Sequence, residues 1–157
     1  MHCKSDSSDS YDLNANELGW EINTEIFKPA KVQGSLIRYP NNNRLSITAM
    51  DGTEGILILI NTPNKNLKGT YPLDKASNNS IKLNNVENKL LNVFTSESCK
   101  AAAGSVIITE HDESSKTVSG YFDVKLCSAT YNSTKKQVII ENGKFNKASY
   151  FESIKDK

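Results

Sequence analysis

Alternation of apolar and polar residues is the dominant pattern of the chain after residue 17. Residues 44–50 place Leu45, Ile47 and Ala49 on one side of an extended segment, and residues 118–126 alternate in the same way. A repeat of two is typical of β-strands that bury one face. Residues 55–60 are apolar on both sides, which favours a central strand. The pattern therefore predicts a chain built of strands.

Turn-forming residues separate these segments at intervals of roughly 8–12 residues, a spacing typical of β-sandwiches and barrels. Strands are predicted at residues 19–22, 25–28, 31–39, 44–50, 55–60, 69–73, 90–95, 105–111, 118–126, 136–141 and 144–150. Residues 74–88 are predicted to be irregular apart from a weak strand at 81–83, and only residues 97–103 have helix propensity. The expected fold is all-β: an antiparallel β-sandwich or a flattened barrel of consecutive hairpins, with little helix.

Two local signals refine this expectation. Asn142-Gly143 is the strongest hairpin dipeptide in the chain, so residues 136–141 and 144–150 are predicted to form the last hairpin. Pro72 cannot donate to a strand ladder, which assigns residues 69–73 to an edge of the sheet.

Length and charge limit the classes of protein that remain. The chain has 157 residues, enough for one domain, and a net charge of +1 from 19 basic and 18 acidic residues. Nucleic-acid binding usually requires a strongly basic face, so no nucleic-acid partner is expected. No apolar run approaches the roughly 18 residues of a membrane span. We expect a monomer with one β domain at residues 17–151 and a C-terminal tail at 152–157.

The N-terminal residues 1–16 differ from the rest. Residues 4–16 consist almost wholly of Ser, Asp and Asn, with Tyr11 and Leu13 as the only large apolar residues, which predicts a disordered polar tether. Cys3, at the head of this tether, resembles the lipidated first residue of a bacterial lipoprotein after its signal peptide is removed. The alternative is an incidental free thiol. The first interpretation predicts an outer-membrane anchor at Cys3 and a location in the cell envelope, either periplasmic or surface-exposed.

The other two cysteines flank a predicted hairpin. A polar turn at residues 112–116 joins the strands predicted at 105–111 and 118–126. If the register continues, this turn places Cys99 and Cys127 within one β-bulge of directly opposite positions. A Cys99–Cys127 disulfide is therefore predicted, the alternative being two buried free thiols. The prediction depends on export, since disulfides persist in oxidising compartments.

Three segments resemble a known family. Residues 104–122 resemble the pattern G-x-(I/V)-x-I-T…D…(I/V)-S-G-x-F, and residues 137–145 resemble V-x-(V/I)-x-N-G-x-F. Residues 20–30 are similar to an opening hairpin, V-N-G-x-x-F-x-A. Over residues 19–150 the chain thus resembles the DUF6252-like proteins, small β-rich lipoproteins of Bacteroidota. The resemblance implies an all-β fold and an envelope location, and it implies no activity. Thr24 stands where the family usually has glycine, which disfavours a type I′ turn there.

Motifs for chemistry are sparse. The densest cluster, His111-Asp112-Glu113, is interpreted as a solvated turn because adjacent strand residues point to opposite faces. Asp51-Gly52-Thr53-Glu54 lacks the repeated carboxylates of a calcium loop, and no nucleophile elbow or phosphate-binding loop is found. We therefore expect no catalytic residue, no cofactor and no metal.

These observations predict a non-catalytic envelope lipoprotein domain that acts as a binding or accessory module for an unknown envelope protein or small ligand. Trp20, on the opening strand, is predicted to be a core residue. Gly19-Trp20 is one residue short of the G-x-W of the lipocalins, which keeps open a lipocalin-like carrier of a small apolar ligand. An envelope hydrolase is the second alternative.

Overall fold

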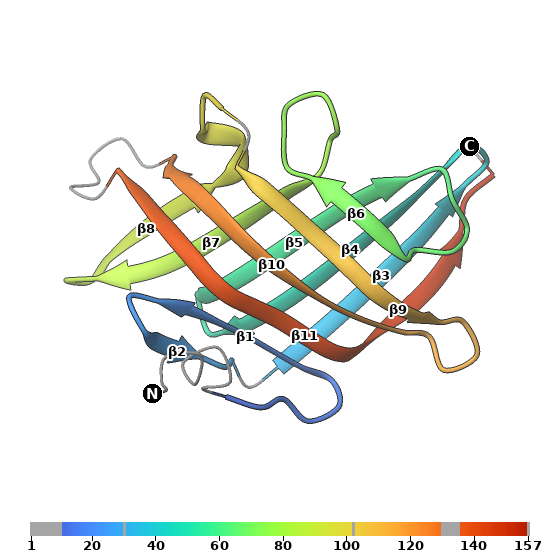
Figure 1. Cartoon of the computed structure of the whole chain (residues 1–157), viewed down its shortest axis with the longest axis horizontal. Helices are drawn as coiled ribbons and strands as arrows, with labels where there is room; N and C mark the ends of the chain where they lie inside the picture. Colours follow the sequence, from blue (N-terminus) through green and yellow to red (C-terminus); the bar gives the residue numbers. More distant parts are fainter. Residues whose placement is uncertain (1–10, 30, 102, 130–135, 157) are drawn as a thin grey trace, which may run out of the picture.

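The computed structural model describes residues 11–29, 31–101, 103–129 and 136–156. The strands are β1 (Glu17–Ile22), β2 (Glu25–Phe27), β3 (Lys31–Tyr39), β4 (Asn42–Asp51), β5 (Glu54–Thr62), β6 (Gly69–Pro72), β7 (Ser80–Glu87), β8 (Leu90–Thr95), β9 (Gly104–Asp112), β10 (Thr117–Ser128) and β11 (Gln137–Ile154) (Figure 1). A short 3-10 helix, η2, spans Ser96–Ser98. The all-β prediction is confirmed. Within the described ranges, no helical segment has the length and apolar character needed to span a membrane.

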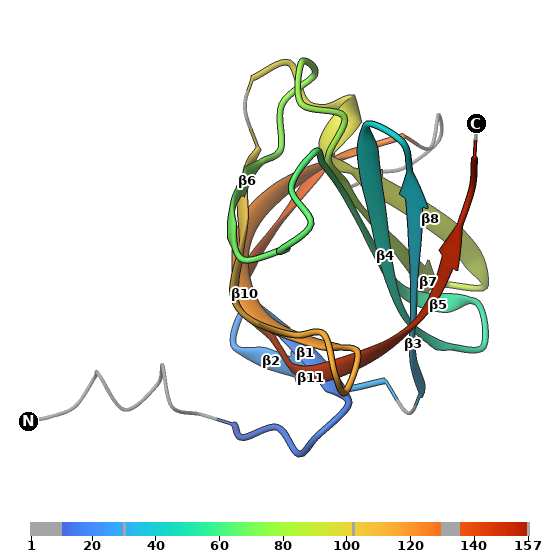
Figure 2. The ribbon, with the colours of Figure 1, turned by 90° about the vertical axis from the view of Figure 1, so that its right-hand side faces the viewer.

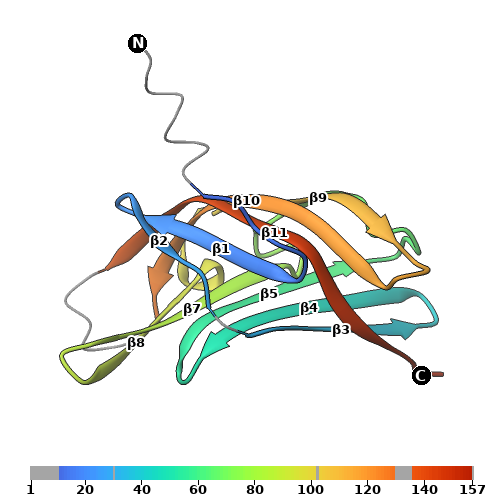
Figure 3. The ribbon, with the colours of Figure 1, turned by 90° about the horizontal axis from the view of Figure 1, so that it is seen from below.

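The strands form one sheet that closes on itself. Their order is β2-β1-β11-β3-β4-β5-β7-β8-β10-β9-β6, and β10 pairs in addition with β11. Two layers result: β1, β9, β10 and β11 lie opposite β3, β4, β5, β7 and β8 (Figures 2 and 3). The edge position predicted for residues 69–73 is confirmed, since β6 ends the order. The sheet is thus a flattened barrel, with buried side chains such as Phe94, Phe122 and Leu36 between its layers.

One joint between the layers is made by the 18-residue strand β11. It pairs antiparallel with β10 along most of its length, and its last residues, 150–154, then pair parallel with β3. This parallel pairing corrects the expectation of a purely antiparallel sheet. Gly34 lies opposite Tyr150 in the register, and a Cβ at Gly34 would lie 2.5 Å from the Ser149 carbonyl oxygen. Glycine at residue 34 therefore allows β11 to cross onto β3.

The prediction of a hairpin at Asn142-Gly143 is wrong. Both residues lie inside the continuous strand β11, where the register with β10 shifts between Phe122 and Val124. Asn142 has φ 51°, and its backbone N–H donates to the Asp123 carboxylate at 2.9 Å. The left-handed conformation of Asn142 would suit a type I′ turn, but here it is part of a β-bulge. The residues before and after Asn142-Gly143 both pair with β10, so the strand continues. A Cβ at Gly143 would lie 2.3 Å from the Phe122 ring, so this glycine is required by packing.

Two tight turns also depart from expectation. Asn23 and Thr24 have φ values of 52° and 68°, the signs of a type I′ turn, although Thr24 is β-branched. Asn88 and Lys89, with φ values of 54° and 65°, make the same kind of turn between β7 and β8. Residues 80–87, mostly predicted to be irregular, form the strand β7.

The boundaries of the domain differ from those predicted. Tyr11 is buried, its hydroxyl bonds the Asn142 carbonyl, and Lys144 lies 4.3 Å over its ring. Lys144 Nζ also donates to the Tyr11 carbonyl at 2.7 Å. Residues 11–16 are therefore packed against β11, which corrects the predicted tether of residues 1–16 over this part, while residues 1–10 lie outside the described ranges. Strand β11 extends to Ile154, so the tail predicted at 152–157 begins later. Cys3 lies outside the described residues.

The disulfide prediction is confirmed, with a refinement of its position. Cys99 and Cys127 are bridged, with their Cα atoms 5.1 Å apart. Cys99 follows η2, and Cys127 lies opposite Thr95 of β8. The β9–β10 ladder ends earlier, at the Gly104–Val124 pair. The disulfide consequently reinforces the second joint between the layers, where β8 meets β10.

Candidate functional site

A cleft opens between the two layers beside the β1–β2 hairpin. Its lining residues come from this hairpin, from the β4–β5 turn and from β7. In Figure 3 the hairpin lies in one layer, and the β4–β5 turn and β7 lie in the other. The cleft has a volume of about 270 Å³ and is referred to below as the Trp20 cleft. The lining residues are Trp20, Ile22, Ile26, Phe27, Lys28, Pro29, Asp51, Glu54, Gly55, Leu83, Asn84 and Asn85.

The hairpin supplies an aromatic wall to the Trp20 cleft. Trp20 and Phe27 are directly opposite in the β1–β2 register, so their side chains share one face. Their rings are stacked with centroids 5.7 Å apart and an interplanar angle of 12°. Trp20 is only 3% exposed. Ile22, Ile26 and Leu83 add aliphatic surface, so most of the wall is apolar.

Two polar atoms of cleft-lining residues are buried without a hydrogen-bond partner in the described part of the chain. They are Trp20 Nε1, which carries a donor N–H, and Asn84 Oδ1, an acceptor. A buried polar atom left unpaired costs about 1–3 kcal/mol. Asn84 lies on β7 opposite Gly55 of β5, and the absence of a side chain at Gly55 leaves no local partner in that pair. Both residues line the cleft, but neither of these two atoms is exposed to solvent.

The rim of the Trp20 cleft carries more acidic than basic groups. Asp51 and Glu54 come from the β4–β5 turn, and Glu54 Oε2 accepts a hydrogen bond from the Val86 N–H at 2.9 Å. Lys28 is engaged elsewhere, because its Nζ donates to the Asp12 carbonyl at 3.3 Å and lies 3.9 Å from Glu17. An anionic ligand would thus meet two carboxylates and an ammonium group that already has partners.

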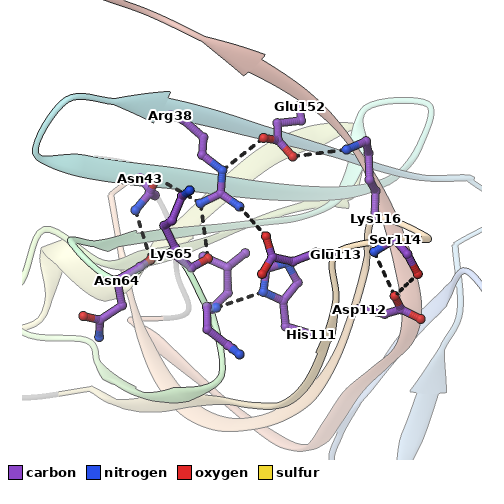
Figure 4. A network of polar contacts seen from close by, with 12 residues as sticks. Arg38, Asn43, Asn64, Lys65, His111, Asp112, Glu113, Ser114, Lys116 and Glu152 are labelled. Carbon is purple, nitrogen blue, oxygen red and sulfur yellow. Dashed lines mark hydrogen bonds and ion pairs between the residues drawn. The ribbon is translucent and has the colours of Figure 1, made fainter.

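A second polar cluster lies around Arg38, at the joint where β11 reaches β3 (Figure 4). Val32, Gly34, Leu36 and Arg38 form the buried face of β3, so the guanidinium group points toward the interior. Its nitrogens contact Glu152 Oε2 at 3.1 Å, Asn43 Oδ1 at 3.1 Å, the Lys65 carbonyl at 3.2 Å and Glu113 Oε1 at 3.7 Å. We call this cluster, with the neighbouring Lys116, His111 and Tyr150, the Arg38 network.

Two carboxylates at this cluster, Glu152 and Asp112, are held in their charged forms. Burial alone would raise the pKa of Glu152, but hydrogen bonds from Arg38 and Lys116 outweigh it and keep that pKa below its usual value. At the β9–β10 turn, hydrogen bonds from Ser114 and Ser115 lower the pKa of Asp112 to about 2. Asp112 therefore fixes the turn, and Glu113 reaches back to Arg38.

His111 has a defined tautomer. Its Nδ1 accepts the Leu67 backbone N–H at 3.0 Å, so the ring proton is on Nε2, which lies 2.7 Å from the Tyr150 hydroxyl. Burial lowers the pKa of His111, which favours this neutral form. The prediction of a solvated turn is correct for the exposed Asp112 and Glu113 and is corrected for His111, which is half-buried and joins the 66–68 loop to β11.

The Arg38 network differs from the Trp20 cleft because each nitrogen of its central guanidinium group already contacts a group of the protein. Among the described residues no group of three or more His, Cys, Asp or Glu side chains is arranged to hold a metal ion. The Trp20 cleft is the candidate functional site.

The sequence indicated part of this arrangement. Trp20 was predicted to be a core residue on an opening strand, and it is buried. Asn84 was missed because residues 74–88 were predicted to be mostly irregular. Arg38 was also missed, although the alternation of Val32 and Leu36 places residue 38 on the buried face of the predicted strand. Cys99 and Cys127 lie together at the other joint, and Cys3 is not among the described residues.

Comparison with known proteins identifies the family of the chain. No curated protein and no solved structure matches it. A family model described as a domain of unknown function (DUF6252) matches residues 14–149. This match begins in the segment that packs against β11 and ends within β11 itself, and it includes the Trp20 cleft and most of the Arg38 network. Since it spans most of the sequence, the protein belongs to the DUF6252 family.

Proposed function

We propose that the protein is a non-catalytic binding module of a Bacteroidota cell envelope, which takes a small, partly apolar ligand in the Trp20 cleft. The observation that carries the proposal is the largely apolar, aromatic wall of the Trp20 cleft, with a few polar residues beside it. Binding sites for small molecules combine apolar surface with a few polar groups.

The form of the cleft favours a lateral site over the central cavity of a lipocalin-like carrier. The largest buried side chains fill the space between the layers, among them Phe94, Phe122 and Leu36. The Trp20 cleft lies beside this core, at the end of the β1–β2 hairpin. The ligand of the proposed module would therefore bind at the side of the flattened barrel.

The envelope location is supported by two features of the chain. The Cys99–Cys127 disulfide suits an oxidising compartment. Cys3, ahead of a polar segment, suits a lipid anchor on the outer membrane. Fractionation of cells that express the protein with its native export signal tests the anchor: Cys3→Ser should release the protein from the membrane fraction, and unchanged retention would refute the anchor.

Native mass spectrometry of the protein purified from its own envelope tests the binding function. We expect a discrete additional small mass on the intact chain. Ile26→Trp, which enlarges a half-exposed side chain at the cleft, should remove that mass. Ile139→Trp, at an exposed isoleucine on β11, should retain it and serves as the matched control. A chain without added mass, or one that carries only a second protein, would overturn the small-ligand function.

A further inference from the structure

We infer that the outer side of the layer formed by β3, β4, β5 and β7 binds an extended anionic polysaccharide. This surface is separate from the Trp20 cleft, and the inference does not depend on the proposed small-ligand function. It follows from the sign and spacing of the charges on the surface, from the hydroxyl and amide groups between them, and from the apolar side chains beside those groups.

The burial pattern determines which side chains form this surface. Buried and more exposed residues alternate along these strands, and paired residues of neighbouring strands share a face (Figure 3). The charged residues at the outward positions are Lys31 of β3, Arg44 of β4 and Lys82 of β7, and all three are exposed. Arg44 Nε donates to Asn61 Oδ1 at 3.3 Å, an uncharged partner that leaves the positive charge unbalanced. We call this surface the basic face.

Carboxylates are absent from the described outward positions of the basic face. The acidic residues of its four strands, Asp51, Glu54 and Glu87, fall at the alternate positions, in register with the buried residues. Among the described residues, none of the three cations forms a salt bridge. The opposite layer differs, because Asp123 and Glu141 are exposed on its outer side. A surface that carries only positive charge attracts anions.

The spacing of the cations favours a long anion over a small one. In the register, Lys82 lies two strands across and four residues along from Arg44, and Lys31 lies three strands from Lys82. With about 4.8 Å between strands and about 3.3 Å per residue, the Cα atoms of the cations are about 16–20 Å apart. Three side chains cannot converge on one small anion across these distances. A polymer with repeated carboxylates can contact all three.

Hydroxyl and amide groups lie between the cations. Ser35 is paired with Ser46, and Gln33 is paired with Thr48 in the next outward row of the same two strands. These four side chains are partly exposed and make no hydrogen bond with another described residue. Serine is depleted in protein–protein interfaces, whereas the hydroxyl groups of a sugar can both donate to and accept from such side chains. The composition therefore favours a polysaccharide over an acidic protein.

Apolar side chains adjoin these polar groups. Phe151 of β11 is 84% exposed and lies beside Ser35 in the register. The same cross-strand row continues through Ser46 to Leu59. Leu57 and Leu59 are half-buried, so they do not project as the side chains that enter a lipid layer do. The apolar faces of sugar rings can pack on Phe151 and Leu59.

Binding of polygalacturonate, in which every sugar carries a carboxylate, tests the inference. Its methyl ester has the same sugar chain without the charge and is the matched control. By biolayer interferometry we expect polygalacturonate to bind about tenfold more tightly than the ester, and added salt to remove this difference. Equal binding of the two polymers, or no binding of polygalacturonate, would overturn the inference.

Replacing the three cations together tests the basic face. The triple variant Lys31→Gln, Arg44→Gln, Lys82→Gln should bind polygalacturonate about tenfold more weakly, since each exposed ion pair contributes little by itself. The matched control makes the same change at three exposed lysines in loops, Lys68, Lys75 and Lys100. It should stay within about twofold of the parent. Equal losses would mean that net charge, and not this face, holds the polymer, and would overturn the inference.

Phe151→Ala tests the contact with the sugar rings. It should weaken the binding of polygalacturonate about fivefold and leave the binding of poly-glutamate, which has carboxylates but no rings, within about twofold. Ile139→Ala is the matched control, because Ile139 is 54% exposed on the outer side of the other layer. It should leave both affinities unchanged. An unchanged affinity of Phe151→Ala for polygalacturonate would contradict a polysaccharide ligand.

Two further probes separate the other anionic partners. Tighter binding of poly-glutamate than of polygalacturonate would assign the basic face to an acidic protein, and tighter binding of phosphatidylglycerol vesicles would assign it to a membrane. Either result would overturn the polysaccharide. None of these measurements involves a residue that lines the Trp20 cleft, so the small-ligand function is tested separately by native mass spectrometry.

Discussion

The Arg38 network and the Trp20 cleft both bury polar groups in the same sheet, but they do so in opposite ways. At Arg38 the guanidinium nitrogens contact two carboxylates, an amide and a backbone carbonyl of the same chain. At the Trp20 cleft an indole N–H and an amide oxygen are buried with no partner among the described residues. A satisfied polar cluster stabilises a fold, whereas an unsatisfied one leaves hydrogen-bonding capacity for another molecule. The difference favours a structural role for the first region, and the second is the region in which we propose that a ligand binds.

Replacing Arg38 is the strongest test of this difference. Arg38→Met keeps the length of the side chain and removes every donor, so Asn43 Oδ1 and the Lys65 carbonyl lose their partner and Glu152 keeps only Lys116. We expect a loss of about 3 kcal/mol in the free energy of unfolding, measured by urea denaturation. Arg44→Met, at an exposed position on β4, should stay within about 0.5 kcal/mol of the parent. A loss of equal size in the two variants would remove the structural role of the network.

Features that depend on neighbouring residues could be predicted from the sequence. The alternation in residues 44–50 and 118–126 gave the correct strands, because one buried face imposes a repeat of two. The Cys99–Cys127 disulfide was predicted from the register of the 112–116 turn, although the β9–β10 ladder ends at the Gly104–Val124 pair and the bridge lies where β8 meets β10. Trp20 was correctly expected in the core. The strands depend on interactions within a short stretch of chain.

Features that depend on distant partners could not be predicted. Asn142-Gly143 suits a hairpin and a bulge equally well, and only the pairing of β11 with β10 decides between them. The Arg38 network joins β3, β9 and β11 through a parallel pairing that has no local signal. The Trp20 cleft is likewise lined by residues of β1 and of β7, which are distant in the sequence. Its polar contribution from Asn84 could not be foreseen before β7 was known to be a strand.

Acid should weaken the Arg38 network through His111. Burial, and to a smaller extent the charge of Arg38, lower the pKa of His111 in the folded protein, against the raising effect of Glu113, Glu152 and Asp112. The unfolded chain, with an ordinary pKa of about 6.5, then binds more protons than the folded chain at mildly acidic pH. The contribution is fully present above about pH 6.5 and is lost as the pH falls through that value toward the lower folded pKa. One group contributes at most about 1.4 kcal/mol per pH unit.

Urea denaturation between about pH 8 and pH 5 measures this effect, with His111→Gln as the comparison. Glutamine can accept the Leu67 N–H and does not titrate, so the variant should show a flatter dependence on pH in this range. Parallel curves for the two proteins would contradict the assignment of the neutral tautomer. The same comparison made with Asn84→Leu should leave the pH dependence unchanged, because the Trp20 cleft contains no histidine.

The hairpin that carries the Trp20 cleft contains a strained turn, and relaxing it should stabilise the protein. Thr24 has φ 68°, a conformation that costs a non-glycine residue about 1–2 kcal/mol. Thr24→Gly removes this cost but adds the greater entropy of glycine in the unfolded chain, about 0.5–1 kcal/mol. We expect a net gain of about 0.5–1 kcal/mol by urea denaturation. Lys31→Gly, in the extended strand β3, is the control and should destabilise the protein. The opposite results would show that the gain depends on the left-handed backbone of residue 24.

Asn84→Leu should have the smallest effect on stability and is the most direct contrast with Arg38→Met. Arg38→Met replaces a buried side chain and Asn84→Leu a half-buried one, each with an apolar side chain of similar length, but the buried Asn84 Oδ1 has no partner to lose among the described residues. Removing an unpaired acceptor also removes its cost of burial, so we expect the free energy of unfolding to stay within about 0.5 kcal/mol of the parent, on the stabilising side. A loss of 1 kcal/mol or more would mean that Asn84 Oδ1 is paired in solution. In that case the two polar regions would be alike, because each would pair its buried polar atoms.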